Sequence, residues 1–316
     1  MTTLRIGTRG SQLALWQAQT VAGLLKAAGI GSELVIIKTT GDRIQNAPLT
    51  EAGGKRLFVK EIEDALIAGQ VDLAVHSAKD MPAALAEGLA LTAALPRDDP
   101  RDAIVISPHA HTGPVPDLCA LEQALGAGTT LGTGSIRRTA QLHTLFPRAA
   151  FAPVRGNVDT RLRKLDEGGY DALVLAAAGL RRLGFGARIT TVLPVEHCVP
   201  APGQGIIAIE TRAGDRNTER LLEPLNDARA ATSLRAERAL VAALGGGCQL
   251  PLGGLALHDG GALEMHAVVA TPDGRRMLKR RGRAPAADPE SLGRQIAGEL
   301  ARDGADEILD AVRKES

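Results

Sequence analysis

The first two thirds of the chain alternate short apolar runs with amphipathic helical patterns, and this alternation restricts the fold more than any other feature. The expected elements are strands at Leu4–Thr8, Leu34–Thr40, Leu73–His76 and Leu89–Ala94, and helices at Leu13–Ala28 and Lys55–Ala68. In the second helix the apolar residues follow the i, i+3, i+4 spacing of an amphipathic helix. Such alternation predicts an α/β fold with a mostly parallel sheet and helices on both faces.

A second series of the same kind follows the loop Pro96–Arg101. Its expected elements are, in order, Ala103–Ile106, a helix near Leu121–Leu125, Thr130–Gly132, a helix through Arg137–Leu145, Ala150–Val154, a helix through Thr160–Leu165, and the strand Ala172–Ala176. The proline-rich stretch Leu193–Gly203 is expected to cross back, so that Ile206–Glu210 rejoins the first sheet. Two α/β lobes joined by paired crossovers leave a cleft between them.

A third pattern begins near Thr218 and predicts a small C-terminal α+β domain. It has a long helix through Leu234–Leu244, the segment Gly245–Gln249, two alternating strands with turns at 259–261 and 272–274, and a final helix that starts at Asp288 with Pro at its first position. The expected boundaries are residues 1–96 plus 198–214 for the first lobe, 97–197 for the second lobe and 215–316 for the C-terminal domain.

Composition restricts the partner. Lys plus Arg number 37 against 36 Asp plus Glu, so no global basic field favours nucleic acid or an anionic membrane. The six aromatic residues (four Phe, one Trp and one Tyr) are too few for rows of base-stacking platforms. We therefore expect a small-molecule partner, with no nucleic acid and no membrane. A monomer is expected as well.

The cysteines and the N-terminus favour the cytoplasm. The three cysteines, Cys119, Cys198 and Cys248, are widely spaced and contain no C-x-x-C pair, so neither a disulfide framework nor a thiolate zinc site is expected. The first residues lack an apolar signal region, and no apolar run approaches the roughly 20 residues of a membrane span.

Several common motifs are absent or incomplete. The chain has no G-x-x-x-x-G-K-[ST], and the nearest approach to a dinucleotide fingerprint, 203–208, opens a strand and is interpreted as a turn. The stretches 109–111 and 196–198 contain possible metal donors without a partner at ligand spacing, so no metal is expected. The loop Gly41–Gly54 is long for an α/β lobe and fits either a mobile lid or a disordered surface loop.

The segment 71–82 is more informative. An apolar strand ends at Ser77, Lys79 and Asp80, and open α/β sheets bind ligands at the carboxyl ends of their strands. The alternative is an exposed ion pair that contributes little. The position of these residues at a strand terminus before Pro82 favours a functional site.

Arginines recur at the starts of successive elements of the second lobe: Arg137 and Arg138 after Ser135, Arg155 and Arg161, and Arg181 and Arg182. Helix N-termini already attract anions, so cations there indicate a negatively charged ligand. The planar arginine fork binds carboxylate in a bidentate manner. With Arg9 and Ser11 at the first β-α junction, the set predicts a cleft for a polycarboxylate, although each arginine alone fits a solvated face.

A thiol follows three glycines in the segment 245–248. A lone cysteine is usually a small buried hydrophobe. The glycines at Cys248 instead allow something bulky to approach closely, and thiolates are good nucleophiles that can be permanently alkylated. A covalent role for Cys248 is therefore a second hypothesis.

Together these motifs resemble the porphobilinogen deaminase (hydroxymethylbilane synthase) family. The resemblance covers nearly the whole chain and is weakest in Gly254–Pro285. It is carried, in the family's order, by the opening R-I-G-T-R-G-S-Q-L-A-L-W-Q, G-G-K-R-L-F-V-K-E around Lys55, H-S-A-K-D-M-P from His76, G-T-G-S-I-R-R ending at Arg138, R-G-N-V-D-T-R from Arg155, A-P-G-Q-G ending at Gly205, and G-G-G-C ending at Cys248.

The resemblance implies a three-domain fold whose first two domains are built like the lobes of periplasmic solute-binding proteins. It also implies a dipyrromethane cofactor joined to Cys248 by a thioether. The implied reaction condenses four porphobilinogen molecules head to tail, releases ammonia each time, and yields the linear tetrapyrrole hydroxymethylbilane.

The resemblance also assigns roles to residues. Asp80 matches the catalytic aspartate, which would stabilise the cationic azafulvene left when ammonia departs. The expected cofactor-binding residues are Cys248, Lys79, Ser77, Ser135, Arg137, Arg138 and Arg155. The expected substrate-binding residues are Arg9, Ser11, Arg155, Arg161, Arg182, Lys55 and Phe58. Position 181 is often Lys in the family, so Arg182 rather than Arg181 is assigned to the site.

The competing hypothesis is a two-lobed carboxylate-binding module without turnover, in which Cys248 is structural. A covalent adduct of two pyrrole units on the purified protein would favour the enzyme, whereas an unmodified mass with reversible ligand binding would favour the module.

Overall fold

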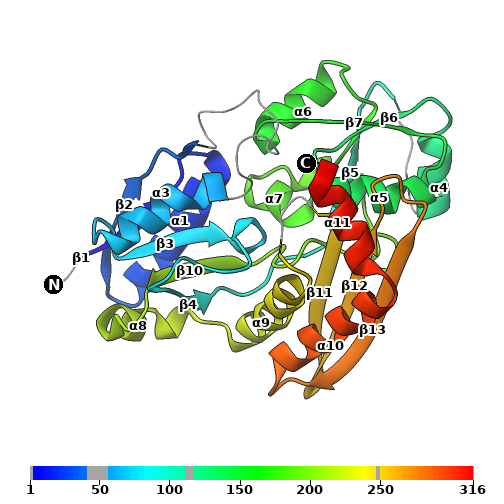
Figure 1. Cartoon of the computed structure of the whole chain (residues 1–316). Helices are drawn as coiled ribbons and strands as arrows, with labels where there is room; N and C mark the ends of the chain where they lie inside the picture. Colours follow the sequence, from blue (N-terminus) through cyan, green and yellow to red (C-terminus); the bar gives the residue numbers. More distant parts are fainter. Residues whose placement is uncertain (1–2, 41–55, 111–114, 116, 247–249, 316) are drawn as a thin grey trace.

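The computed structural model describes residues 3–40, 56–110, 115, 117–246 and 250–315. Over these residues the chain forms two five-stranded sheets and one three-stranded sheet, with the strand orders β2-β1-β3-β10-β4, β7-β6-β8-β5-β9 and β11-β12-β13. In Figure 1 the first lobe (blue and cyan) lies at the left, the second lobe (green) at the upper right, and the C-terminal domain (yellow to red) at the lower right.

The first lobe packs helices against both faces of its sheet. Its elements are β1 (Thr3–Thr8), α1 (Gln12–Ala27), β2 (Gly31–Ile36), α3 (Arg56–Ile67), β3 (Leu73–Ser77), the 3-10 turn η1 (Ala78–Asp80), β4 (Leu89–Ala94), β10 (Ile207–Arg212), α8 (Arg216–Leu222) and the 3-10 turn η3 (Glu223–Leu225). Val21 and Leu25 of α1 meet Leu4 and Ile6 of β1 in a buried core. Gly29 and Gly69, at positive φ, end the two long helices as predicted.

One strand of this lobe lies elsewhere than predicted. The expected strand Leu34–Thr40 begins instead at Gly31 and ends at Ile36, because its register is set by parallel pairing with β1, from Thr3 opposite Gly31 to Thr8 opposite Ile36. The strand is at the sheet edge, so its first residues need no apolar side chains.

The second lobe repeats this plan. Its elements are β5 (Asp102–Ile106), α4 (Leu118–Ala124), β6 (Thr130–Gly132), α5 (Ile136–Leu145), β7 (Ala150–Ala152), α6 (Val158–Asp166), β8 (Ala172–Ala176), α7 (Ala177–Arg182), the 3-10 turn η2 (Gly186–Arg188) and β9 (Thr191–Val192). Apolar side chains of β5 and β8, such as Ile104 and Val174, form its centre with Leu142 of α5.

The direction of the strands determines where functional groups gather. β10 runs antiparallel to β3 and β4, and β5 runs antiparallel to β8 and β9. Each of these sheets thus has four strands in one direction and one reversed strand among the described residues, which confirms a mostly parallel sheet. The reversed strands are the two that follow the crossovers between lobes. Their amino ends therefore lie at the same sheet edge as the carboxyl ends of their neighbours.

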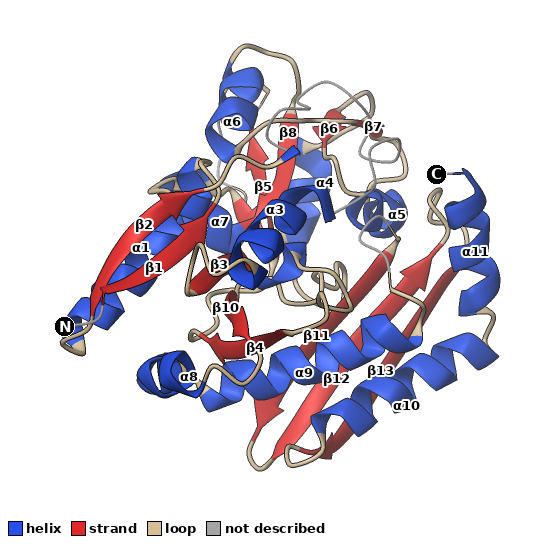
Figure 2. Cartoon of the chain, turned by 60° about the vertical axis from the view of Figure 1, so that its left-hand side comes forward, coloured by secondary structure: helices blue, strands red, loops and turns tan. Residues whose placement is uncertain are grey.

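The C-terminal domain packs helices across one face of a sheet, as Figure 2 shows for α9 and α10. Its elements are α9 (Ala228–Ala243), β11 (Leu252–Asp259), β12 (Ala262–Ala270), β13 (Met277–Pro285), α10 (Pro289–Arg302) and α11 (Ala305–Glu315). The prediction of two strands was wrong, because the third, β13, is an antiparallel edge strand without apolar alternation. The predicted final helix is two helices, separated at Gly304, whose φ is +95°.

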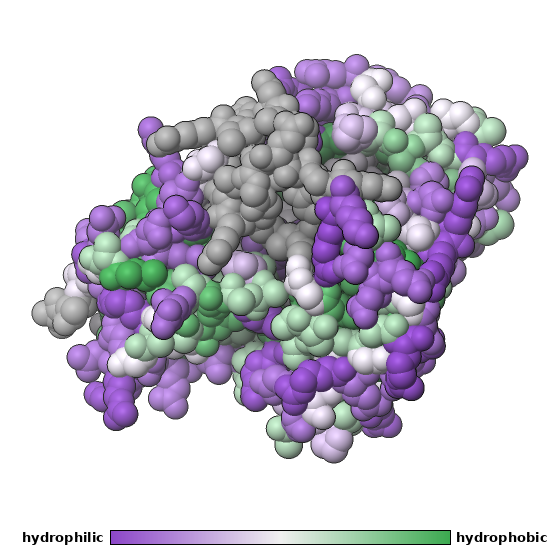
Figure 3. Space-filling view, viewed as in Figure 1, coloured by the Kyte–Doolittle hydropathy of each residue, from purple (hydrophilic) through white to green (hydrophobic). Residues whose placement is uncertain are grey.

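The edge strand β13 carries a row of cations on its exposed side. Arg281 pairs with Glu264 at 2.6 Å and Arg283 pairs with Asp259 at 2.9 Å. The outer surface of this domain, at the lower right of Figure 3, is largely hydrophilic. Charged side chains of this kind keep a free sheet edge from pairing with other chains. In the described part of the chain, no helix has the length and apolarity needed to cross a membrane.

Candidate active site

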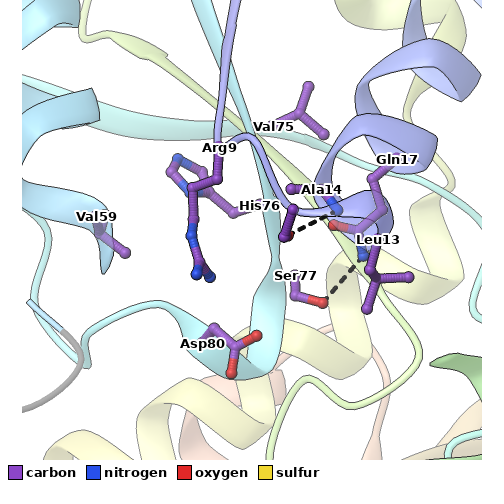
Figure 4. A pocket seen from close by; sticks show the side chains of 10 residues that line it. Arg9, Leu13, Ala14, Gln17, Val59, Val75, His76, Ser77 and Asp80 are labelled. Atoms are coloured by element: carbon purple, nitrogen blue, oxygen red, sulfur yellow. Dashed lines mark hydrogen bonds between the residues drawn. The ribbon is translucent and has the colours of Figure 1, made fainter. Parts of the chain in front are cut away.

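Asp80 lies at the carboxyl end of a buried strand. Residues 73–76 of β3 are all buried, and the chain then turns through η1, which ends at Asp80. Asp80 lines a recess with Arg9, Ser11 and Ser77, and Figure 4 shows the Arg9 side chain extending toward Asp80. The other lining residues are Leu13, Ala14, Gln17, Val59, Val75 and His76. The structure thus brings together four of the residues predicted for the site.

The two hydroxyl groups of the recess are held by neighbours. Ser11 is the N-cap of α1, and its Oγ accepts a hydrogen bond from the amide of Ala14 at 3.3 Å. The Oγ of Ser77 accepts one from Nε2 of Gln17 at 3.0 Å. The amino end of α1 therefore faces the recess with its positive dipole end, which favours an anionic ligand there.

Lys79 adds a perturbed cation beside the recess. Burial lowers the pKa of Lys79 to about 8, against the opposing attraction of Asp80. Its Nζ donates to Oε1 of Gln204 at 3.4 Å. An anion that binds beside this lysine would favour its charged form, because the attraction between the two charges offsets the loss of water that burial causes.

Arg137 and Arg138 lie in the first turn of α5, where they were predicted to meet a ligand's carboxylates. The structure shows that both are buried against a carboxylate of the protein itself, Asp102 at the amino end of β5. Nη1 of Arg137 donates to Oδ2 of Asp102 at 2.7 Å, and Nε and Nη2 of Arg138 donate to Oδ1 at 3.0 and 2.8 Å. Burial opposes ionisation of Asp102, yet the two guanidinium groups hold its pKa far below the usual range.

These two arginines therefore do not by themselves imply an external anion, contrary to the prediction. One internal carboxylate already compensates part of their charge, and the pair still exceeds it by one positive charge. Burying a carboxylate is tolerated only when it is paired and hydrogen-bonded, and Asp102 is both.

The remaining residues of the second lobe lie at its edge. Arg161 of α6 has its pKa lowered to about 10 by burial and by the charge of Arg138, while Asp80 opposes the shift, so Arg161 lies within electrostatic reach of the recess. Its Nε donates to the carbonyl of Gly156 at 2.7 Å. Arg155 is exposed in the loop before α6, and Ser135 is the N-cap residue of α5 with a half-buried side chain.

Arg181 and Arg182 were predicted to lie at the start of an element. The structure instead places them in the last turn of α7. Cations are stabilised at that end by the helix dipole. Nη2 of Arg182 donates to the carbonyl of Gly205 at 2.6 Å, and its Nε lies 3.4 Å from Oδ2 of Asp98. Its guanidinium also lies over Trp16 of α1, 5.7 Å from the ring centroid. Arg182 therefore contacts the crossover region and the first lobe.

Some predicted site residues fall outside the description. Lys55, Cys248 and the segment 41–54 lie outside the described residues, and Phe58 is described only as part of the backbone of α3. The chain is described up to Gly246, where a Cβ would lie 2.8 Å from the Cβ of Ala83. Because Ala83 follows Asp80 by three residues, the glycine segment approaches the Asp80 loop two residues before Cys248.

Sequence reasoning missed four buried polar residues in or near the recess. Nε2 of His76, which lines the recess, lies 3.0 Å from Oε2 of Glu210, which is buried on β10. Asp102 begins the reversed strand β5, and Gln204 lies in the turn that precedes the reversed strand β10. A useful signal was available for Asp102, since a carboxylate beside an all-apolar strand requires a cationic partner.

Cys198, one of the possible metal donors at 196–198, is instead a buried thiol hydrogen-bonded to Asp102. Burial raises the pKa of the Cys198 thiol to about 12, with Asp102 adding to the shift, and the thiol donates to Oδ2 of Asp102 at 3.3 Å. Among the described residues no group of three or more His, Cys, Asp or Glu side chains has the arrangement of a metal site.

The fold and this edge define a two-lobed α/β protein with a third domain and a cation-lined recess around one carboxylate. Comparison with known protein families identifies the class more specifically. Residues 4–220 match the family described as porphobilinogen deaminase, dipyromethane cofactor binding domain, and residues 231–302 match porphobilinogen deaminase, C-terminal domain. The chain belongs to the porphobilinogen deaminase family.

Two relatives named porphobilinogen deaminase match this chain over almost its whole length. The chain is 48% identical over 313 residues to a porphobilinogen deaminase of Acidithiobacillus ferrooxidans, with 98% of each chain covered. It is 46% identical over 314 residues to that of Thiobacillus denitrificans, with 99% of each covered.

Solved structures with a similar arrangement include periplasmic and substrate-binding domains. The BvgS periplasmic VFT2 domain of Bordetella pertussis has a TM-score of 0.39 at 18% identity and covers 70% of this chain and 85% of its own. Substrate-binding domain 2 of GlnP from Lactococcus lactis, in an open conformation, has a TM-score of 0.42 at 11% identity and covers 71% and 88%. The division into two lobes rests on the sheet order above, because these scores are low.

Proposed function

We propose that the chain is a transferase with hydroxymethylbilane synthase activity, which joins four porphobilinogen molecules head to tail with release of ammonia. The observation that carries this proposal is the recess where Asp80 and Arg9 converge beside Lys79. Porphobilinogen has an acetate, a propionate and an aminomethyl group on a pyrrole, so its recognition needs cations and its reaction needs an anion. The recess supplies both.

The residues present fit a dipyrromethane cofactor. Lys79, Arg137 and Arg138 outnumber the carboxylate of Asp102. Burial lowers the pKa of Lys79, so a carboxylate bound beside it would favour its charged form. Cys248 would hold the group by a thioether, with Ser77, Ser135 and Arg155 as further polar contacts. When bound, the cofactor supplies the free pyrrole position to which the first substrate is joined.

The chain's own residues then divide the work. Arg9, Ser11, Arg155, Arg161 and Arg182 bind the substrate's carboxylates and orient it, with Lys55 and Phe58 from the segment before α3. Asp80 accepts a hydrogen bond from the pyrrole N–H and stabilises the positive charge that develops on the substrate as ammonia leaves. A fixed carboxylate in a partly dehydrated recess stabilises such charge far better than water does.

Leu222 and Leu225 pack in the core of the first lobe, so residues 215–225 move from the expected C-terminal domain to that lobe. The proposed domain boundaries are therefore residues 1–96 plus 198–225, 97–197 and 226–316. The two reversed strands support them, because each lies just past a crossover between sheets. We also propose that the protein is a cytoplasmic monomer with no nucleic-acid or membrane partner. The free thiols of Cys119 and Cys198 support a reducing compartment. The described part exposes four large hydrophobic residues, namely Leu24, Ile36, Ile67 and Leu257, and they come from four different elements. Single exposed apolar side chains of this kind are normal on a monomer.

Counting ammonia tests the proposal. Purified protein supplied with excess porphobilinogen should release four molecules of ammonia for each linear tetrapyrrole formed, over many turnovers. Ligand binding without ammonia release would instead identify a carboxylate-binding module.

A further inference from the structure

The turn Gly203-Gln204-Gly205 has a shape that only glycines allow. Gly203 and Gly205 have φ values of +77° and +89°. A Cβ at 203 would lie 2.8 Å from the backbone of Ala78 and Lys79, and one at 205 would lie 2.5 Å from the carbonyl oxygen of Asp98. The turn therefore packs closely against Ala78 and Lys79 on one side and against Asp98 on the other. Its middle residue, Gln204, is 1% exposed.

The side-chain amide of Gln204 contacts both lobes. Its Nε2 donates to the carbonyl of Pro100 at 2.7 Å and to Oδ1 of Asp102 at 2.9 Å. Its Oε1 accepts from Nζ of Lys79 at 3.4 Å. Since both N–H groups face oxygen atoms and the carbonyl faces an ammonium, only this orientation of the amide satisfies all three partners.

Asp102 extends this connection to the arginines. It accepts from Arg137 and Arg138, as described above, and Nη1 of Arg137 also donates to the carbonyl of Val199 at 2.7 Å. The charges that act on Lys79 come from all these elements: Asp80 and Asp102 raise its pKa, whereas Arg138 and Arg137 lower it. One neutral side chain thus lies between a cation of the first lobe and a buried ion cluster of the second.

We propose that Gln204 is a positioning residue that couples Lys79 to the Asp102–Arg137–Arg138 cluster, so that cations from both lobes form one prearranged carboxylate-binding set. Its role in cofactor capture rests on the proposed function. Prearranged charges bind a polycarboxylate faster and more tightly than side chains that must first be ordered.

The first experiment measures coupling without any turnover. In full-length protein carrying Cys248→Ser, the pKa of Lys79 is obtained from the pH dependence of its labelling by an amine-reactive reagent, followed by peptide mass spectrometry. Gln204→Met removes the acceptor and should lower that pKa by about half a unit or more, whereas Gln204→Glu places a carboxylate there and should raise it by about one unit or more. A purely structural role would not produce shifts of opposite sign.

Gln141→Met is the matched control. Gln141 is equally buried, accepts from the amide of Val199 at 2.7 Å and donates to its carbonyl at 3.1 Å, and no hydrogen bond to Lys79 or Asp102 is seen for it in the described structure. The control should leave the pKa of Lys79 unchanged. Equal shifts in this control and in Gln204→Met, or no shift in either Gln204 variant, would overturn the proposal.

The second experiment follows cofactor loading with Cys248 intact. Cofactor-free protein is given porphobilinogen, and the adduct is timed by intact mass; Gln204→Met should load about tenfold more slowly or worse than Gln141→Met. Loading at the control rate would also overturn the proposal. If the parent protein acquires no adduct at all, the proposed function fails, while the labelling experiment still decides whether Gln204 couples the two lobes.

Discussion

Asp80 and the arginines around it meet different charges, so substitutions separate their roles. Asp80→Asn keeps the shape but removes the charge that opposes the positive charge developing on the substrate. We expect kcat to fall about 100-fold or more, because one prearranged group commonly contributes this much to the transition state. Porphobilinogen and cofactor should still bind. Rates of ammonia release against substrate concentration measure the effect, and normal turnover would refute the assignment.

Arg155→Leu and Arg138→Leu should instead impair carboxylate positioning, because Arg155 is assigned to charge that every substrate already has and Arg138 is assigned to the carboxylates of the cofactor. The expected result is failed cofactor assembly or chains that stall at a particular length, as seen by mass spectrometry after limiting porphobilinogen. Arg138→Leu should also lower the melting temperature, because it leaves Asp102 with one ionic partner fewer. Elongation at the parental rate in both variants would contradict this account.

Cys248→Ser should give folded protein without cofactor and nearly without activity, since a serine hydroxyl is a far weaker nucleophile than a thiol at neutral pH. Cys119→Ala and Cys198→Ala are the controls and should remain active. Cys198 is buried and its raised pKa of about 12 keeps it a thiol, so it is a poor nucleophile. Intact mass and turnover decide the matter: an adduct that disappears in either control would identify a different anchoring thiol.

Lys79 gives cofactor loading a pH dependence. With a pKa of about 8, its ammonium is charged below that pH and increasingly neutral above it, so its attraction for carboxylates is lost as the pH rises. The loading rate of cofactor-free protein should therefore decline above pH 8. Lys79→Arg should move that decline upward by about one pH unit or more, because arginine stays charged throughout this range. Identical profiles for the two proteins would exclude Lys79 as the titrating group.

Among the elements, the Gly203–Gly205 turn controls how closely the crossover approaches η1. Gly203→Ala should destabilise the fold by more than Gly214→Ala, although both residues have φ near +78°. At position 214 a Cβ meets nothing within 4 Å, so only the strain of left-handed backbone remains, about 1 kcal/mol. At position 203 it meets the backbone of Ala78 and Lys79 at 2.8 Å. Urea unfolding compares the two, and equal losses of stability would mean that the close approach is unimportant.

Elements with strong apolar periodicity could be predicted from the sequence, and elements at edges could not. The helix from Arg56 and the strand from Leu73 follow their patterns closely, because burial dictates their side chains. β13 escaped prediction because an exposed edge strand needs no apolar alternation. α9 begins at Ala228, earlier than its apolar residues indicate, because Asp227 caps it by accepting from the amide of Ala230 at 2.7 Å.

The residues of the candidate site also differ in how far the sequence predicts them. Asp80, Arg9, Ser11 and Ser77 could be placed together because strand ends and helix starts meet at one sheet edge. The partner of Arg137 and Arg138 could not be predicted in this way. Asp102 reaches them from a reversed strand, and the direction of that strand depends on the crossover between the lobes.

At the scale of the whole molecule, two crossovers bring the charges of both lobes to one place. β5 enters the second lobe with Asp102 at its amino end, and the turn before β10 returns with Gln204. The C-terminal domain approaches the same place through α9, where Arg238 donates to the carbonyls of Pro82 and Ala83 at 2.9 and 2.8 Å. All three parts therefore contact the loop that carries Asp80 or the ions beside it.

The most direct test of this account is the intact mass of the purified full-length protein before and after limiting porphobilinogen. We predict an initial mass above that of the chain by two pyrrole units, located at Cys248 by peptide mapping. After substrate is added, a ladder of species should appear, each one pyrrole unit heavier than the last, and then return to the starting mass as product leaves. An unmodified chain that binds porphobilinogen reversibly, with no ladder, would contradict it.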